Sequence, residues 1–241
     1  MNILAIGNSF SQDATRYLHR IARSDGFLLQ VTNLYIGGCP LERHFRNMLS
    51  EDSVYGLESN GEITGFFVSL KEALLNRSWD YITVQQASNF SFNYGTYQPY
   101  LKELCAYIRK MCPNAKILIH QTWAYEQGSA KLERTEKYTD QKDMFLDLEE
   151  AYKKAAKDSD AEFIIKSGEL LQKLIENGIK NTHRDGFHLS LGLSRYAVAL
   201  LWYALLSGND ISENTFCDFD EQISEEEIAI VKKCVKEIVN K

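Results

Sequence analysis

Ser9 stands in a segment whose sequence suits a nucleophilic serine. The residues Gly7-Asn8-Ser9-Phe10-Ser11 directly follow a short apolar run and precede a helical pattern. This order places the Ser9 hydroxyl at a tight turn on the carboxyl edge of a predicted sheet, where a nucleophile is accessible. The alternative is that Ser9 or Ser11 caps the helix with its side-chain oxygen, a common use of serine at a helix start.

A carboxylate and an imidazole occur three residues apart near the other end of the chain. Asp185 and His188 lie in His183-Arg184-Asp185-Gly186-Phe187-His188-Leu189-Ser190, just ahead of a predicted helix. In a helical turn this spacing puts both side chains on one face, so Asp185 can accept a hydrogen bond from His188. The second imidazole nitrogen is then free to act as a base, and with Ser9 the set predicts acyl transfer. Alternatively, Asp185 caps the following helix and His188 packs beside it.

A metal site is a second hypothesis for the same segment. His183, Asp185 and His188, together with His120, could supply nitrogen and oxygen ligands. Against this hypothesis, the sequence has no HExxH or equivalent pair, and the short segment would have to bend sharply to offer three ligands to one ion. We therefore expect neither a metal nor an organic cofactor.

Two further segments could supply the hydrogen-bond donors that a tetrahedral oxyanion needs. Gly37 and Gly38 end a predicted strand, and their missing side chains let a backbone N–H approach a ligand closely. Asn89 lies in the loop that follows another predicted strand and carries an amide donor. In the alternative interpretation, the two glycines form an ordinary turn and Asn89 closes an Asx-turn.

An alternating series of strands and helices must position these candidates. Short apolar or β-branched runs are separated by amphipathic helical patterns, which predicts parallel strands with crossover helices on both faces. Ligands of such a sheet bind outside the carboxyl ends of its strands. The predicted strands are 2–7, 28–36, 81–85, 116–120 and 162–165, and the predicted helices are 12–23, 41–49, 97–111, 138–157, 169–177, 195–206 and 225–239.

Length and composition predict a globular protein with a single domain over residues 1–241. The chain has 241 residues, of which 44% are hydrophobic and 25% are charged, as in ordinary soluble proteins. Residues 51–65 are rich in Gly, Ser, Asn and acidic residues, so we expect an insertion loop there. We expect the C-terminal part, 190–240, to be helical.

The net charge argues against some classes of binding partner, and the cysteine pattern indicates the cellular compartment. The 27 Lys and Arg against 33 Asp and Glu give a net charge of −6, which disfavours nucleic acid as a partner. The first residues lack the features of a signal peptide, and no apolar run approaches about 18 residues, so we expect no membrane partner. Five scattered cysteines without CxxC spacing favour a reducing, cytoplasmic compartment. A secreted or periplasmic location is expected only if a leader has been removed; the sequence predicts no oligomeric state.

Taken together, four segments resemble the conserved blocks of the SGNH (GDSL-like) hydrolase superfamily. Gly7-Asn8-Ser9-Phe10, Gly38, Asn89 and Asp185-x-x-His188 occur in this order on the predicted strand ends. More closely, the residues 33–44, 85–88, 120–125 and 185–190 resemble the bacterial DUF4886 branch of that superfamily. The resemblance covers nearly the whole chain.

This resemblance implies a three-layer α/β/α sandwich of the flavodoxin-like type, with a five-stranded parallel sheet in the order 2-1-3-4-5. It also implies a serine hydrolase that cleaves an ester through an acyl-enzyme, with Ser9 as nucleophile, His188 as base and Asp185 as its orienter. The implied oxyanion hole comprises the N–H groups of Ser9 and Gly38 and the side chain of Asn89.

Three positions depart from the pattern of that superfamily. Asn8 replaces the usual Asp, and in the third block, commonly Gly-x-Asn-Asp, Ala87 replaces the glycine and Phe90 the Asp. The extra methyl group of Ala87 lies near the implied oxyanion hole. Gln86 is therefore an alternative to Asn89 as the side-chain donor.

Aromatic residues in predicted edge loops suggest a substrate class. Aromatic faces beside a polar site suit sugar rings, so we expect a small-molecule ester with a short acyl or acetyl group, for instance on a carbohydrate. The alternatives are aromatic packing in the core and, for the whole protein, a non-catalytic carbohydrate- or ester-binding module or a metal-dependent hydrolase. The candidate substrate contacts are Gln86, His120, Trp123 and Phe187.

Overall fold

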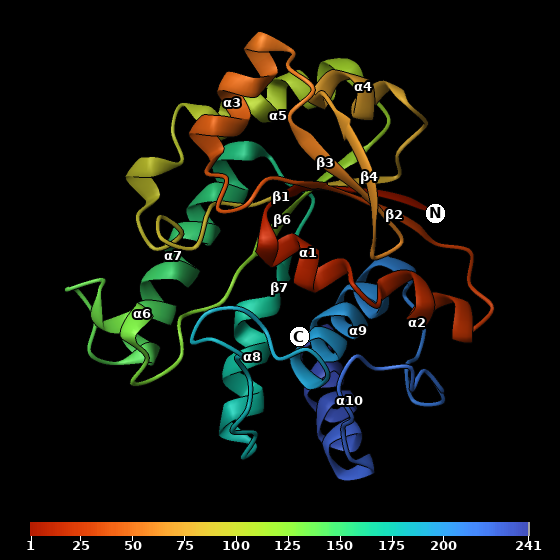
Figure 1. Ribbon diagram of the computed structural model, residues 1–241, viewed down its shortest axis with the longest axis vertical. Coiled ribbons are helices and arrows are strands. Elements are labelled where there is room, and N and C mark those ends of the chain that lie inside the picture. The colour runs from red at the N-terminus through yellow and green to blue at the C-terminus, as the bar shows by residue number, and fades with distance from the viewer. Residues whose placement is uncertain (241) are drawn as a thin grey trace.

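A sheet of seven strands forms the centre of the computed structural model, which describes residues 1–240 (Figure 1). The strand order is β4-β3-β2-β1-β5-β6-β7. Neighbouring strands are parallel from β2 to β7, whereas β3 is antiparallel to both β2 and β4. The strands are β1 (Asn2–Gly7), β2 (Gln30–Tyr35), β3 (Tyr55–Ser59), β4 (Glu62–Val68), β5 (Tyr81–Val84), β6 (Lys116–Gln121) and β7 (Ile164–Lys166).

The five parallel strands confirm the predicted fold class and the order 2-1-3-4-5, which corresponds to β2-β1-β5-β6-β7. The predicted insertion loop at 51–65 is wrong in part, because β3 and the start of β4 lie there. Ser59 pairs with Glu62 across a two-residue turn in which Asn60 and Gly61 have φ values of 54° and 84°. An Asn-Gly pair is the favoured turn of a tight hairpin, because both central residues must adopt positive φ. The sheet therefore has seven strands instead of five.

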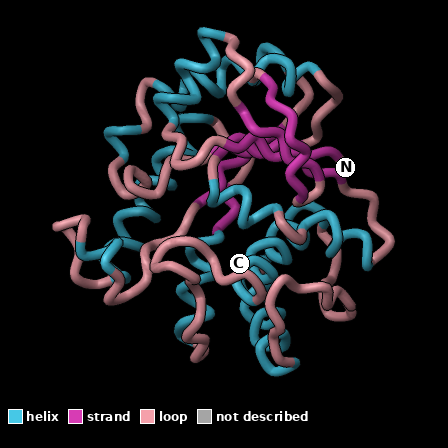
Figure 2. The backbone as a smooth tube through the Cα atoms, viewed as in Figure 1, coloured by secondary structure: helices cyan, strands magenta, loops and turns pink. Residues whose placement is uncertain are grey.

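Helices cover both faces of the sheet, as Figure 2 shows with the strands in magenta between helices in cyan. Alternate residues of β1 enter two separate apolar cores: Ile3 and Ala5 pack with one helical layer, and Leu4 and Ile6 with the other. One layer contains α1 (Ser9–Thr15), α2 (Leu18–Ser24), α8 (Ser167–Glu176), α9 (Leu193–Ser207) and α10 (Glu225–Val239). The other contains α3 (Leu41–Ser50), α4 (Leu70–Leu75), α5 (Tyr100–Met111) and α7 (Gln141–Ser159).

The helices differ from the predicted ones in a few places. The predicted helix 12–23 is divided into two helices, because α1 ends at Thr15 and α2 begins at Leu18. Two short helices, α4 and α6 (Ala130–Glu133), fall outside the predicted ranges. The C-terminal part contains α9 and α10, as expected for 190–240. Across residues 1–240, every helix falls short of the length and apolarity needed to cross a bilayer.

Candidate active site

Ser9 is the first residue of α1 and follows β1 after a single connecting residue. That residue, Asn8, caps the helix: its side-chain oxygen accepts a hydrogen bond from the N–H of Phe10 at 3.0 Å. The Ser11 hydroxyl is buried and donates to the carbonyl of Asn8 at 2.8 Å. The cap is therefore neither Ser9 nor Ser11, and the Ser9 hydroxyl is left for another partner.

That partner is His188. The Nε2 atom of His188 lies 2.8 Å from the Oγ atom of Ser9, although the two residues are 179 positions apart. The Nδ1 atom of His188 lies 2.7 Å from the Oδ2 atom of Asp185. Because a carboxylate only accepts hydrogen bonds, Nδ1 carries the proton, and the lone pair of Nε2 faces the serine hydroxyl. The geometry therefore brings both Ser9 and Asp185 within hydrogen-bond distance of His188.

Asp185 also organises the turn that carries His188. Its Oδ1 atom accepts from the backbone N–H of His188 at 2.8 Å and from that of Phe187 at 3.3 Å. Burial raises the pKa of this carboxyl, but the hydrogen bonds from His188 and Phe187 outweigh burial and lower the pKa below its usual value of 3.8. Asp185 is thus both a turn-closing residue and a charged partner of the imidazole. The alternative that it caps the following helix is wrong, because that helix, α9, begins at Leu193 and its N-cap is Gly192.

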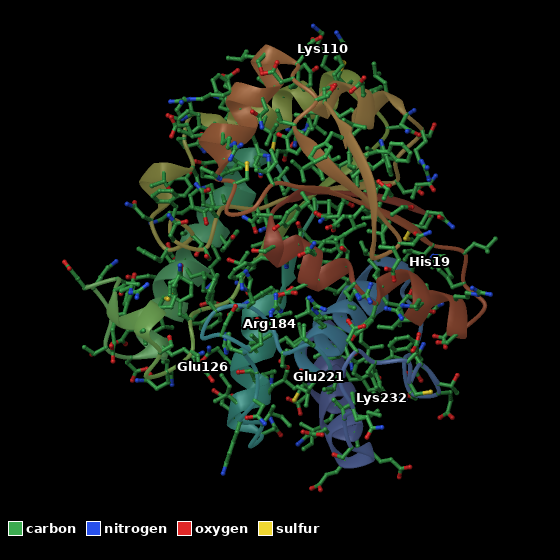
Figure 3. The ribbon with its side chains drawn as sticks, in the orientation of Figure 1. His19, Lys110, Glu126, Arg184, Glu221 and Lys232 are labelled. Carbon is green, nitrogen blue, oxygen red and sulfur yellow. The ribbon has the colours of Figure 1, made fainter. Side chains whose placement is uncertain are left out.

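An ionic cluster around the buried carboxylate of Asp13 fixes the His188 turn to α1. Asp13 lies one helical turn after Ser9, is fully buried, and accepts from the Leu189 N–H at 3.0 Å. Arg184 donates to both Asp13 oxygens at 3.0 Å, and Arg195 donates at 2.8 Å. Figure 3 labels Arg184 near α1. The helix that begins with Ser9 therefore also holds the segment that carries His188.

The predicted backbone donors lie on neighbouring strand ends. The Cys39 N–H donates to the Ile36 carbonyl at 3.2 Å and closes a turn in which Gly38 has a φ of +62°. The side-chain amide of Asn8 donates to the Cys39 carbonyl at 3.2 Å, which an aspartate could not do. Asn8 thus links the Gly38 turn to α1. Within residues 1–240, the N–H groups of Ser9 and Gly38 have no hydrogen-bond partner.

The two candidates for a side-chain donor occupy different environments. Gln86 is buried; its oxygen accepts from the N–H groups of Leu41 and Ala87, each at 2.9 Å, and its nitrogen donates to Thr96. Asn89 is exposed in the turn after β5, and its side chain is unpartnered among the described residues. Gln86 is therefore engaged in holding the loop, whereas the amide of Asn89 is available to a ligand.

Three of the four candidate substrate contacts lie inside the protein. Gln86, His120 and Trp123 are buried, so the expectation that they contact substrate directly is wrong. His120 joins strand ends instead, because its Nδ1 donates to Gln85 at 2.8 Å and its Nε2 lies 3.1 Å from the Ser167 hydroxyl. Trp123 donates to the Phe187 carbonyl at 2.8 Å and supports the His188 turn. Phe187 itself is half-buried.

The imidazoles of the metal hypothesis face separate partners. His183 donates from Nε2 to the Ala124 carbonyl at 3.1 Å, and burial lowers its pKa to about 4. Burial also lowers the pKa of His120 to about 3. Nowhere in residues 1–240 do three His, Cys, Asp or Glu side chains gather as a metal site would require. His183, Asp185, His188 and His120 therefore do not form one ligand set.

Comparison with known proteins places this arrangement in a family. Residues 2–237 match the model of a domain of unknown function, DUF4886. This chain belongs to the DUF4886 family. A crystal structure of a DUF4886 protein from Bacteroides uniformis is 33% identical, covers 100% of this chain and 95% of its own, and superposes with a TM-score of 0.92.

The DUF4886 chain is also similar to more distant structures. One assigned to the SGNH hydrolases, from Slackia heliotrinireducens, is 26% identical with a TM-score of 0.61, covering 86% of this chain and 98% of its own. An acetylxylan esterase from Geobacillus stearothermophilus shares the fold at 12% identity and a TM-score of 0.55, covering 84% and 93%. A search of proteins with curated functions finds no match.

Sequence reasoning missed the ionic cluster of Asp13, Arg184 and Arg195 in this DUF4886 protein. One signal was present: Asp13 lies between the core residues Phe10 and Tyr17 and next to Ala14, on the apolar side of the first helix. A charged residue at such a position needs a buried partner. The partners lie more than 170 residues away in the sequence, so their identity depends on the tertiary fold.

Proposed function

We propose that this protein is a serine esterase that hydrolyses acyl esters through a covalent acyl-enzyme. The observation that carries the proposal is the pair of short contacts around one imidazole, 2.8 Å from Nε2 of His188 to Oγ of Ser9 and 2.7 Å from Nδ1 to Asp185. The likeness to an SGNH hydrolase at 26% identity supports a hydrolase.

The geometry suits a two-step reaction. In the first step, His188 Nε2 takes the proton of Ser9 Oγ while this oxygen forms a bond with the ester carbonyl carbon. The N–H groups of Ser9 and Gly38, with the Asn89 amide, would stabilise the negative charge on the carbonyl oxygen. The bond from the acyl carbon to the alcohol oxygen then breaks, and the alcohol leaves with the proton from Nε2.

The second step regenerates the enzyme. Water gives a proton to Nε2 and forms a bond with the acyl carbon, and the bond from that carbon to Ser9 Oγ breaks as Oγ recovers the proton. The product is a carboxylic acid. Asp185 remains ionised throughout, because its lowered pKa keeps it charged near neutral pH, and its charge stabilises the imidazolium formed in each step.

The expected substrate is a small-molecule ester, and a short acyl or acetyl group on a carbohydrate is the finer proposal. A related fold carries acetylxylan esterase activity in a Geobacillus protein. Of the two aromatic residues expected to contact substrate, Trp123 is buried and Phe187 is half-buried, so little aromatic surface is left for a sugar ring. The acyl group is therefore the better-supported half of the substrate.

Hydrolysis of p-nitrophenyl acetate tests this proposal. We expect turnover that survives EDTA and is abolished by a serine-directed phosphonate. Turnover that is lost with EDTA and restored by a divalent metal would favour a metal-dependent hydrolase. If the folded protein bound acyl esters or sugars but hydrolysed none of a broad ester panel, it would be a binding module on this fold.

A further inference from the structure

An apolar groove of about 560 Å³ lies beside the candidate active site, between α1, β2 and the β3–β4 hairpin. Its walls include Ile36, Leu57, Ile63, Phe66 and Phe67. We call it the hairpin groove. Its volume lies within the range of pockets that bind small molecules, roughly 300 to 1,000 Å³.

The hairpin exposes more apolar surface than an ordinary edge strand. Ile63, Phe66 and Phe67 are 77%, 69% and 67% exposed, and all three lie on β4, at the edge of the sheet. Edge strands are usually protected by charged residues or proline, since bare apolar edges promote aggregation. Apolar surface that gathers around a groove is a feature of ligand-binding sites.

The hairpin groove is lined in part by residues next to those of the candidate active site, on the helix that begins with Ser9 and in the turn that contains Gly38. Gln12 lines the groove and lies three residues after Ser9 in α1, hence on the same face of the helix. Gly37 also lines it and precedes Gly38, whose N–H is a predicted oxyanion donor. A chain bound in the groove would therefore end at the turn where the ester carbonyl must lie.

The sheet places the groove and the base on opposite sides of Ser9. β2, β3 and β4 lie on one side of β1, whereas β6 lies on the other. The segment after β6 holds the His188 turn: Trp123 donates to the Phe187 carbonyl, and the Glu126 N–H donates to the Gly186 carbonyl, each at 2.8 Å. In ester cleavage the leaving alcohol takes its proton from His188, so the alcohol lies on the His188 side and the acyl group away from it.

The polar groups of the hairpin groove do not favour a sugar as its ligand. Glu58, its buried carboxylate, already accepts from the Gln12 amide and from Asn33 Nδ2, the latter at 2.8 Å. Both carboxylate oxygens of Glu58 are therefore already hydrogen-bonded within the protein. An apolar occupant fits the remaining surface better than a hydroxylated one.

We propose that the hairpin groove is the acyl subsite of the enzyme and takes a medium-length apolar acyl chain, longer than acetyl. This inference rests on the proposed esterase function and replaces the acetyl group considered there with a longer acyl chain. Burial of each additional methylene contributes about fourfold to the specificity constant. Octanoate has about six more methylenes than acetate, so burial of only half of them predicts that kcat/KM for p-nitrophenyl octanoate exceeds that for the acetate by roughly 60-fold, with butyrate between them.

Gly56 offers a way to fill the groove without straining the backbone. It lines the groove, and a Cβ atom there would lie 3.6 Å from the Tyr35 carbonyl oxygen and 3.8 Å from its ring, which are ordinary contacts. Gly65 also lines the groove, but its φ of +79° would strain any side chain. Gly56→Val is thus the variant of choice, and Ser59→Val, on the same strand but outside the groove, is its matched control.

The experiment measures kcat/KM for the acetate, butyrate and octanoate esters with wild type, Gly56→Val and Ser59→Val. We expect Gly56→Val to lower the octanoate-to-acetate ratio at least tenfold and Ser59→Val to leave it unchanged. If Gly56→Val does not fold, Phe66→Ser removes an exposed wall and should lower the same ratio. A wild type that prefers acetate, or a ratio unaffected in the folded variants, would overturn the acyl subsite while leaving the esterase intact.

Two other outcomes would also overturn the proposal that the hairpin groove is the acyl subsite. If size-exclusion chromatography with light scattering finds a dimer that Gly56→Val or Phe66→Ser dissociates without changing the ratio, the groove is covered by a second copy of this chain. If no ester is hydrolysed by the wild type, the proposed function fails and the acyl subsite fails with it.

Discussion

The Oδ2 atom of Asp13 accepts a hydrogen bond from the backbone N–H of Leu189 at 3.0 Å, and Leu189 directly follows the predicted base His188. Asp13 is on the helix that begins with Ser9, so one rigid element fixes the positions of both nucleophile and base. A misplacement of about 1 Å between reacting groups can cost about 100-fold in rate. The contact between Asp13 and Leu189 is therefore a positioning device for the site.

Asp13→Ala should reduce both stability and turnover. It leaves the guanidinium groups of Arg184 and Arg195 without their buried partner, and breaking such a pair costs about 3 kcal/mol. Urea denaturation measures this loss. In the protein that remains folded, kcat should fall more than tenfold with KM nearly unchanged, because the base is displaced while the groove stays intact.

Asp220→Ala is the matched control for the Asp13 variant. Asp220 pairs with Arg195 at 3.0 Å and with Arg16 at 2.9 Å, at a partly exposed place without contact to Leu189. We expect a smaller loss of stability and kcat within about threefold of wild type. Equal losses of kcat in the two variants would argue against a specific role of Asp13 in positioning His188.

Asp185→Asn separates the two roles of Asp185. An asparagine oxygen can still accept from the His188 and Phe187 N–H groups and keep the turn, but it lacks the charge that stabilises the imidazolium. We expect kcat to fall by up to about 10⁴-fold, with a melting temperature close to wild type. Lower stability with full activity would show that Asp185 is only a turn-closing residue.

The oxyanion assignment predicts that Asn89→Ala acts on turnover and not on stability. The Asn89 side chain is exposed and unpartnered within the described residues, so its loss removes no structural hydrogen bond. Removing one oxyanion donor commonly costs about 100- to 1,000-fold in kcat. Steady-state kinetics and thermal denaturation of the same preparation check this prediction.

Gln86→Ala should affect stability more than turnover, because it leaves two buried N–H groups without an acceptor. Leu41 and Ala87 would lose their acceptor, and each buried donor left unpaired costs about 1 to 3 kcal/mol. We expect a destabilised protein whose residual folded fraction keeps most of its kcat. A large loss of kcat in a stable Gln86→Ala protein would transfer the donor role from Asn89 to Gln86.

Buried histidines make the protein sensitive to mild acid. Burial lowers the pKa values of His44 and His120 to about 3 and that of His183 to about 4, whereas unfolded histidines titrate near 6.5. The unfolded chain therefore binds more protons below about pH 6.5, and stability falls as pH decreases toward the folded pKa values. With three such groups the slope is up to about 4 kcal/mol per pH unit.

Urea denaturation at pH 7.5 and 5.5 measures this dependence. His44→Phe, which keeps the ring stacked on Tyr55, should make the slope shallower by about a third. Equal free energies of unfolding at the two pH values would contradict the neutral state of the buried histidines.

The parallel strands and the ends that carry the site were predictable, because their signals are local. The apolar run before Gly7 and the β-branched run before Gln85 identify strands by composition alone. The Asp185-x-x-His188 spacing was interpretable because both residues share one turn. The β3–β4 hairpin was not predicted, because the polar composition of 51–65 is also typical of a loop, although Asn60-Gly61 is a hairpin turn signal.

The remaining features depend on contacts between distant parts of the chain. His120 lies at the carboxyl end of β6 and Trp123 just after it, at the same edge of the sheet as Ser9. The burial of His120 is decided by Trp202 of α9 and Ser167 of α8, which cover that edge. Asp13 and its arginines are likewise brought together only by the tertiary fold. Sequence pattern therefore places residues at the correct edge of the sheet and does not distinguish those facing solvent from those packed beneath.

The most direct test of the central claim is the site at which a fluorophosphonate attaches to the native protein. After incubation with an alkyl fluorophosphonate, intact mass and peptide mapping should find one adduct per chain, on Ser9, and none in Ser9→Ala. Ser11→Ala, which removes the neighbouring buried hydroxyl, should still be labelled. Absence of an adduct in the folded wild type, or an adduct on another residue that persists in Ser9→Ala, would contradict Ser9 as the nucleophile.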